Sequence, residues 1–279
     1  MKIGCHVSIA GGIQNAPKNA ADLDCEVFQV FTRSPRGGKA GELTVEVIKE
    51  FWAEMKAWGI SEFVIHTPYY INFGSKNNRI FYGSSSVIRE ELERATKLKC
   101  KYIMTHLGSY KDLGRKEGFE KLISGLFKAL DGYTGSAQLL VEISAGAGEV
   151  MGGSFEEIKK IITHQKLKKY NLGVCFDTQH AFASGYDLKT PATVKKTISD
   201  FDKVVGLKNL KVIHINDSKV ELGEKKDRHE HIGVGKIGKD GIKAFINDPR
   251  LKNINLYLET KHDLVKRDIK ILKDLRSKI

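Results

Sequence analysis

The chain has 279 residues, a hydrophobic fraction of 41% and a formal net charge of +12. Its length and apolar content exclude a disordered chain, and it contains no apolar run long enough for a membrane-spanning helix. The positive charge favours a polyanionic partner, and the first residues enter a predicted strand instead of a signal peptide, so we expect a cytoplasmic protein without membrane contact.

Strand-type and helix-type segments alternate from one end of the chain to the other. The predicted strands cover residues 2–7, 27–31, 63–66, 102–106, 139–142, 172–177, 210–214 and 256–259. The predicted helices cover residues 13–23, 44–58, 84–99, 118–130, 154–164, 192–205, 239–246 and 264–275. Eight strand–helix units without a linker are typical of a (β/α)8 TIM barrel, so the sequence predicts an α/β protein with a single barrel domain over residues 1–279.

Seven of the eight predicted strands carry a histidine, an aspartate or a glutamate at or next to their last residue, and only the second strand, which ends near Phe31, does not. In chain order these residues are His6, His66, His106, Glu142, Asp177, His214 and Glu259. In a barrel these positions open on the C-terminal face, where active sites form. Buried carboxylates so close together repel one another unless cations separate them, and imidazole with carboxylate suits zinc, manganese or iron better than calcium or magnesium. The sequence therefore predicts a cluster of divalent metal ions on this face.

The segment 173–187 begins as a buried strand and ends in a Gly-Tyr-Asp turn. Within it Asp177 and His180 are three residues apart, so both side chains can face the same point. Such a pair suits a metal or a general acid–base pair. The structural alternative is that Asp177 caps a following helix and His180 packs against it.

A long polar loop follows the seventh predicted strand. It contains Asp227 and His229, which as alternate residues of an extended segment point the same way. With His180 they would complete a third metal centre, whereas the alternative interpretation is a solvated run of charges. The next segment, 233–238, matches GxGxxG, but it follows a polar loop and not the first strand of a βαβ unit. We interpret it as loop geometry and not as a dinucleotide site.

The four cysteines of the chain lie far apart, each in or beside an apolar run: Cys5, Cys25, Cys100 and Cys175. No two of them form a CxxC pair, so the sequence predicts neither a thiolate zinc site nor a disulfide framework. We expect buried thiols in a reducing compartment.

Several multi-residue blocks occur in an order that resembles the endonuclease IV family, the metal-dependent apurinic/apyrimidinic endonucleases. These blocks are His6-Val7-Ser8 with Gly11-Gly12, residues 177–182 continuing through 185–187, residues 214–219, Asp227-Arg228-His229 and Leu258-Glu259-Thr260. The resemblance runs over essentially the whole chain. It implies a DNA-repair endonuclease that hydrolyses the phosphodiester 5′ to an abasic site in double-stranded DNA and leaves a 3′-hydroxyl and a 5′-deoxyribose phosphate.

The resemblance also implies a trinuclear zinc site and a lesion-reading surface. One Zn2+ would be held by His66 and His106, a second by Asp177, His214 and Glu259, and a third by His180, Asp227 and His229, with the catalytic Glu142 bridging the first two. Arg36, Tyr69 and Tyr70 stand where the family inserts side chains into the duplex. We expect a monomer.

Two other functions fit part of this pattern. Sugar isomerases and epimerases also use strand-end His, Glu and Asp to hold a metal, but they need one or two ions and leave the third ligand group and the positive charge unexplained. A non-catalytic lesion-binding protein would use the same surface, although the complete set of ligand residues argues against it.

Overall fold

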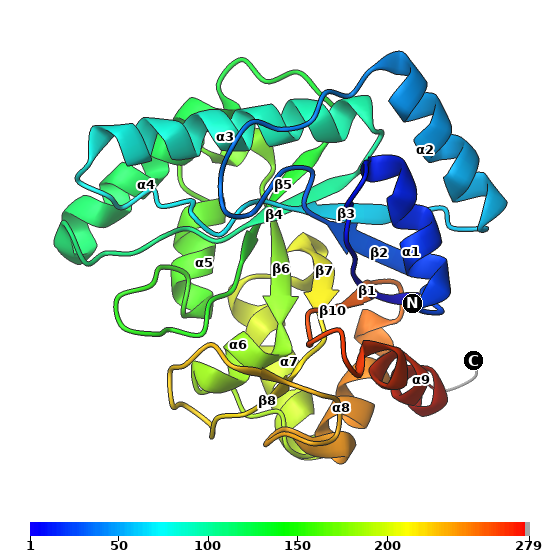
Figure 1. Cartoon of the computed structure of the whole chain (residues 1–279). Coiled ribbons are helices and arrows are strands. Elements are labelled where there is room, and N and C mark those ends of the chain that lie inside the picture. The colour runs from blue at the N-terminus through cyan, green and yellow to red at the C-terminus, as the bar shows by residue number, and fades with distance from the viewer. Residues whose placement is uncertain (277–279) are drawn as a thin grey trace.

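A computed structural model of the chain describes residues 1–276. Within this range eight parallel strands close into a barrel, in the order β1, β10, β7, β6, β5, β4, β3, β2 around its wall (Figure 1). The strands are β1 Ile3–His6, β2 Val27–Val30, β3 Phe63–His66, β4 Tyr102–Thr105, β5 Gln138–Glu142, β6 Gly173–Asp177, β7 Leu210–His214 and β10 Asn255–Leu258. The predicted TIM barrel is confirmed.

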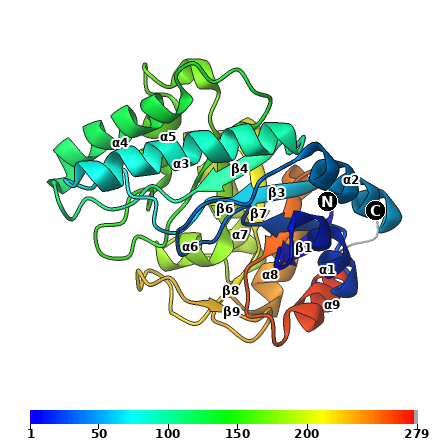
Figure 2. The same ribbon diagram turned by 45° about the horizontal axis from the view of Figure 1, so that its top comes forward.

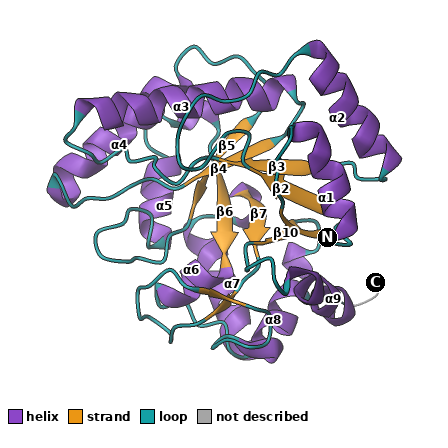
Figure 3. Ribbon diagram, in the orientation of Figure 1, coloured by secondary structure: helices purple, strands orange, loops and turns teal. Residues whose placement is uncertain are grey.

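Helices lie around the outside of the barrel, as both views of the ribbon (Figures 1 and 2) and its colouring by secondary structure (Figure 3) show. They are α1 Ala16–Asp22, α2 Val45–Ala57, α3 Asn78–Lys97, α4 Gly114–Leu130, α5 Phe155–Ile162, α7 Pro191–Val204, α8 Gly238–Ile246 and α9 Val265–Leu275. The last of these, α9, packs beside β1, and Arg276 Nη1 donates to Met1 O at 2.9 Å. The two ends of the described chain therefore lie side by side.

Helix α5 illustrates how the sequence sets these elements. Ser154 caps its N-terminus by accepting a hydrogen bond from the Glu157 N–H, and Glu156 and Glu157 place negative charge in the first turn. Phe155, Ile158 and Ile161 share one face and are buried against the barrel. Each such side chain contributes roughly 1.5–3 kcal/mol when it leaves water.

The structure differs from the prediction in the loops that follow the strands. Helix α3 begins at Asn78 and not at residue 84, because Asn77 caps it by accepting from the Arg79 N–H and the buried Phe81 anchors its first turns. A short helix, α6 (Thr178–Ala183), directly follows β6 in a segment predicted as a loop. The long polar loop contains a small hairpin, β8 (Asp217–Ser218) with β9 (His229–Glu230), which contacts α6.

The barrel interior is built in layers, because every second residue of a strand points inwards. One layer is apolar and takes one residue from each of seven strands: Val27, Val64, Met104, Leu140, Cys175, Val212 and Tyr257. On β1 the corresponding position is Gly4, where a Cβ atom would lie 1.6 Å from Val27 O. Glycine is required there because the two strands approach so closely.

The burial expected of the cysteine thiols agrees with the structure. Each of the four cysteines, all within residues 1–276, is buried and free. None of the helices in the described part of the chain is long and apolar enough to cross a membrane.

Candidate metal centre

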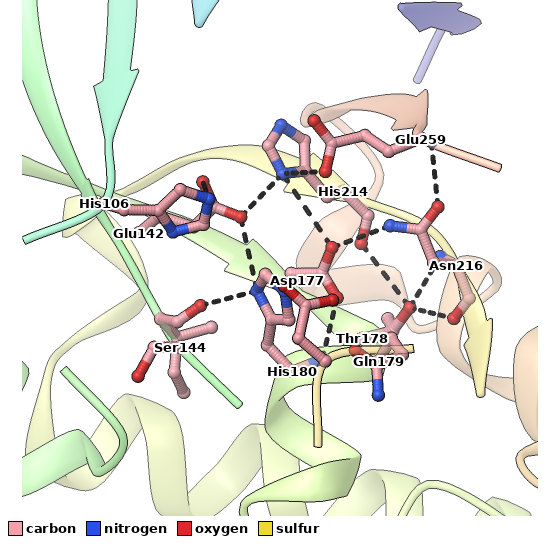
Figure 4. A network of polar contacts seen from close by, with 12 residues as sticks. His106, Glu142, Ser144, Asp177, Thr178, Gln179, His180, His214, Asn216 and Glu259 are labelled. Atoms are coloured by element: carbon pink, nitrogen blue, oxygen red, sulfur yellow. Dashed lines mark hydrogen bonds and ion pairs between the residues drawn. The ribbon is translucent and has the colours of Figure 1, made fainter. Parts of the chain in front are cut away.

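A polar layer lies two residues beyond the apolar layer, on the side where the parallel strands end. Its members in chain order are His6, Gln29, His66, His106, Glu142, Asp177, His214 and Glu259. Figure 4 shows five of these side chains pointing toward one another: His106, Glu142, Asp177, His214 and Glu259. His66, Glu142, Asp177 and His214 are buried. Ligand-type atoms in this layer form groups in which all members lie within 4.8 Å of one another.

The first group joins His66 and His106 to Glu142. His66 Nε2 lies 3.1 Å from Glu142 Oε2, and His106 Nε2 lies 3.9 Å from the same oxygen. The second group joins Glu142 to Asp177, His214 and Glu259. Glu142 belongs to both, so its carboxylate is positioned to bridge them.

The second group is centred on one nitrogen of His214. His214 Nδ1 lies 3.0 Å from Glu142 Oε1, 3.3 Å from Glu259 Oε2 and 3.9 Å from Asp177 Oδ2. Figure 4 shows these carboxylates on the same side of the imidazole ring. Three carboxylates facing one nitrogen is an arrangement that a divalent cation stabilises.

The third group lies between α6 and the β8–β9 hairpin. Asp227 Oδ2 is 3.4 Å from His180 Nε2, and Asp227 Oδ1 is 3.6 Å from His229 Nε2. His229 Nε2 is also 3.6 Å from Asp177 Oδ2, which connects this group to the second one. The hairpin, which is absent from the sequence prediction, brings the two residues of the polar loop to His180.

The hydrogen bonds of the imidazoles test whether these residues fit a metal. His66 Nδ1 donates to Thr67 O at 2.6 Å, and His180 Nδ1 donates to Ile143 O at 2.9 Å, because a carbonyl oxygen can only accept. In a neutral ring the Nε2 atom then carries the lone pair, and in both residues this atom faces a carboxylate. Among the described residues, the buried His180 Nε2 and His229 Nε2 have no hydrogen-bond partner. A bound cation would satisfy them, so the residues fit the group.

Burial and nearby charge act in opposite directions on the pKa values of the cluster carboxylates. Burial alone would raise the pKa of the Glu142 carboxyl, but the charges of His106 and His214 and hydrogen bonds from nearby imidazoles hold this pKa well below its usual range. Burial alone would also raise the pKa of Glu259, but the charge of His214 outweighs this effect and lowers the pKa to about 2. Burial raises the pKa of the Cys175 thiol, which lies beneath the site, to about 12.

Asp177 satisfies both alternatives that the sequence left open. Its Oδ1 accepts from the His180 N–H at 2.8 Å and caps α6. Its Oδ2 faces the cluster and accepts from Asn216 Nδ2 at 2.7 Å. Asn216 Oδ1 in turn accepts from the Glu259 N–H, so one amide orients two of the acidic residues.

Gln29 is a site residue that sequence reasoning missed. The sequence places no ligand-type side chain at the end of the second strand, near Phe31. The alternation from Val27 in the apolar layer instead places Gln29 in the polar layer, where its side chain is fully buried beside His6, His214 and Glu259. Burial lowers the pKa of His6 to about 3, so this neighbour is a neutral ring. The two-residue period of the strand was the signal that would have identified Gln29.

The GxGxxG segment is part of the scaffold. The backbone N–H groups of Gly233, Gly235, Ile237 and Gly238 donate to the Asp217 carboxylate at 3.0–3.3 Å. The segment therefore folds around a buried side chain of the same loop and presents no N–H nest to a dinucleotide.

The three residues expected to contact DNA occupy two loops. The Tyr69 ring lies 5.2 Å from the Phe31 ring and 5.8 Å from the His66 ring, while 62% of the residue remains exposed. Tyr69 and Tyr70 line a cavity of about 470 Å3 that also reaches His106 and Asp227. Arg36 is exposed in the loop between β2 and α2 and lies outside this cavity.

Comparison with known proteins identifies the family. Residues 17–275 match the family described as xylose isomerase-like TIM barrel. The chain is 42% identical over 266 residues to the probable endonuclease 4 of Nitrosopumilus maritimus (strain SCM1), and the match covers 94% of each sequence. It superposes on the crystal structure of endonuclease IV from Thermus thermophilus with a TM-score of 0.87 and 34% identity, covering 99% of this chain and 98% of that one. The chain belongs to the endonuclease IV family.

Membership of the endonuclease IV family confirms the resemblance seen in the sequence motifs. The fold alone is shared more widely, because a D-tagatose 3-epimerase-like protein superposes with a TM-score of 0.74 at 19% identity, over 99% of this chain and 97% of that one. The shape of the barrel does not separate a nuclease from a sugar epimerase. The ligand groups at the strand ends are the feature that can distinguish a nuclease from a sugar epimerase.

Proposed function

We propose that the protein is a DNA-repair endonuclease that hydrolyses the phosphodiester bond 5′ to abasic sites in duplex DNA. The products are a 3′-hydroxyl and a 5′-deoxyribose phosphate. The observation that carries the proposal is the convergence of three ligand groups on one face of the barrel, in a chain of the endonuclease IV family. The proposal includes a monomeric enzyme in the cytoplasm, where its free thiols remain reduced.

Three zinc ions fit the donor set of imidazoles and carboxylates. His66 and His106 would hold the first ion, Asp177, His214 and Glu259 the second, and His180, Asp227 and His229 the third, with Glu142 shared between the first two. When bound, zinc supplies an activated water nucleophile at neutral pH and positive charge for the phosphate oxygens.

The residues of the chain fix the geometry in which this chemistry occurs. Glu142 is held from several sides by imidazoles, so its carboxylate keeps one position and stays ionised. The backbone carbonyls of Thr67 and Ile143 fix the rings of His66 and His180. The reacting phosphodiester would therefore meet preorganised groups, and little reorganisation would remain for the reaction itself.

The surface around the site suits a damaged duplex. The net charge of +12 favours contact with phosphates and predicts salt-dependent binding. An abasic nucleotide has no base to unstack or unpair, so its extrusion towards the barrel mouth costs less than that of an intact nucleotide. The cavity beside Tyr69 and Tyr70 opens next to His106 and Asp227, where an extruded sugar-phosphate would reach the ligand groups.

The direct test is cleavage of a duplex that contains one abasic analogue, with an undamaged duplex of the same sequence as control. We expect one nick on the 5′ side of the analogue, and a fragment that a DNA polymerase extends because it ends in a 3′-hydroxyl. Tight binding without cleavage by zinc-loaded protein would instead indicate the non-catalytic lesion binder. Interconversion of ketoses by the same preparation, without nicking, would indicate the sugar epimerase.

A further inference from the structure

The side-chain amide of Gln29 contacts two of the candidate ligands, His214 and Glu259. Its Oε1 lies 2.7 Å from His214 Nε2, and its Nε2 lies 2.6 Å from Glu259 Oε1 and 3.1 Å from His6 Nδ1. The residue is 0% exposed, so water does not compete for these contacts. Both N–H groups of the amide therefore have a partner, Glu259 and His6, and the amide oxygen has one partner, His214.

Donor and acceptor chemistry sets the orientation of this amide. The NH2 group of Gln29 lies 2.6 Å from Glu259 Oε1 and donates to this carboxylate oxygen. The carbonyl oxygen of the same amide then faces His214, and because that oxygen can only accept, His214 carries a proton on Nε2. The Nδ1 atom of His214 is left to face Glu142, Asp177 and Glu259.

In each of the three buried imidazoles of the cluster, those of His66, His180 and His214, one ring nitrogen donates to a carbonyl oxygen. A backbone carbonyl accepts from the outer nitrogen of His66 and of His180. For His214 the partner of that nitrogen is the side chain of Gln29. His214 Nδ1 also faces Glu259 Oε2, while Gln29 holds Glu259 Oε1, so the three side chains form a closed ring of contacts.

We propose that Gln29 is a positioning residue of the metal centre: it fixes the His214 ring and the Glu259 carboxylate so that both face one ion, held with Asp177. The inference rests on the proposed function in that the centre binds zinc. It assigns to the second strand a role in the site, so that all eight strands of the barrel supply a polar side chain to the same layer. A partner that orients a ligand typically changes metal affinity by about 10–100-fold when it is removed.

The test compares zinc release from the zinc-loaded wild type and from the Gln29→Met variant, which keeps the length of the side chain and removes the amide. We expect one of the three ions to dissociate into a chelator about 10–100-fold faster, while release of the other two is unchanged. The matched control is Gln138→Met, because Gln138 lies at the opposite end of the barrel, at the start of β5, and contacts Asn171 O. The control should release zinc as the wild type does. Gln29→Asn, which withdraws the amide by one methylene, should also lose one ion faster.

A second readout follows the ring proton itself. The Nε2 proton of His214 should give a slowly exchanging NMR signal in the wild type and a fast-exchanging or missing one in Gln29→Met. The Nδ1 proton of His66, held by Thr67 O, is the internal control and should not change. Unchanged zinc release together with an unchanged His214 signal would overturn the role of Gln29. A wild-type protein that binds no transition metal would instead overturn the proposed function, so the two failures are distinguishable.

Discussion

His66 Nε2 faces Glu142 Oε2 across 3.1 Å inside the barrel, where both side chains are buried. The other nitrogen of His66 already donates to Thr67 O, so this contact requires either a second proton on the ring or a cation between two lone pairs. Glu142 Oε1 lies 3.4 Å from His180 Nδ1 and 3.0 Å from His214 Nδ1. The carboxylate of Glu142 is therefore the group that the ligand sets share.

Replacing Glu142 with Gln keeps the shape of this side chain and removes its charge. We expect the rate of abasic-site cleavage to fall by at least about 100-fold, because two cations would no longer be held near one anion. Binding of abasic duplex should persist, since the residues proposed to contact DNA lie on the loops. Glu62→Gln is the control, because Glu62 precedes β3 at the other end of the barrel, and it should cleave normally. Near-normal turnover of Glu142→Gln would contradict the assignment.

Metal content gives an independent check of the three ligand groups. We expect elemental analysis to find close to three transition-metal ions per chain, chiefly zinc. Prolonged chelation should abolish cleavage, and added zinc should restore it. Fully active protein with at most one ion would be incompatible with three centres.

Much of the fold and of the site follows from local sequence patterns. The eight strands and their helices are visible because buried apolar runs alternate with helical periodicity, and the ligand-type residues stand at strand ends that a barrel brings together. Asp227 and His229 are grouped with His180 both by their alternation in an extended segment and by the family motifs. That grouping depends on the β8–β9 hairpin, whose strands are two residues each and too short to leave a pattern.

Two features were missed for different physical reasons. Gln29 was missed because only the last residue of its strand was considered as a candidate ligand. The inward-facing residues of this strand alternate from Val27, and Gln29 is the next of them. Helix α6 was overlooked because its six residues are fixed by a tertiary role, namely the Asp177 cap, more than by helical periodicity. A side chain such as that of Gln29, which hydrogen-bonds to the candidate ligands, has no sequence spacing that distinguishes it.

A buried ion-pair network holds the loop that carries Arg36. Arg94 donates to Thr32 O at 2.9 Å and to Gly41 O at 2.7 Å, and so joins the two ends of this loop. The adjacent Glu91 is fully buried and accepts from Arg33 Nε at 2.6 Å and from the Thr32 hydroxyl. Glu91 is the negative charge that makes the burial of two arginines tolerable.

Glu91→Gln should therefore lower the free energy of unfolding by about 3 kcal/mol, the lower end for breaking a buried ion pair, since Glu90 still faces Arg33. The matched control is Glu90→Gln. The Glu90 side chain is 50% exposed, so its loss should cost no more than about 1 kcal/mol. Urea titration of both variants measures the difference. Equal losses would mean that the buried charge has no special role.

A pH effect is expected where the two ends of the described chain meet. Burial alone would raise the pKa of Glu26, but hydrogen bonds from Arg276 and from the Ile3 N–H hold it below its ordinary value of 4.5. A folded-state pKa below the unfolded one means that the stabilisation is complete above pH 4.5 and is lost as the pH falls through the folded value.

The stability difference between the wild type and Glu26→Gln should accordingly shrink between about pH 6 and about pH 3. Because this pair is partly exposed, we expect a difference of no more than about 1 kcal/mol at the upper pH. Denaturant titrations at both pH values measure it. A stability difference that grows on acidification would contradict a lowered pKa of Glu26 in the folded protein.

The last prediction concerns how the lesion is read. Tyr69 and Tyr70 are 62% and 38% exposed beside the cavity at the barrel mouth, and their bulk suits the gap left by a missing base. The alternative is that these rings only cover the barrel mouth, because Tyr69 packs on Phe31 and near His66.

If the tyrosines enter the duplex, the Tyr69→Ala/Tyr70→Ala variant should bind abasic DNA less selectively. We expect the affinity ratio of abasic over undamaged duplex, at fixed salt, to fall by about 10–100-fold, which equals about 1.4–2.7 kcal/mol. Tyr82→Ala removes a ring of intermediate exposure, 50%, from α3 and should leave the ratio unchanged, since Tyr82 packs against Phe81 and Lys128. Zinc content and thermal stability should match the wild type. An unchanged ratio in the double variant would show that the rings only cover the barrel.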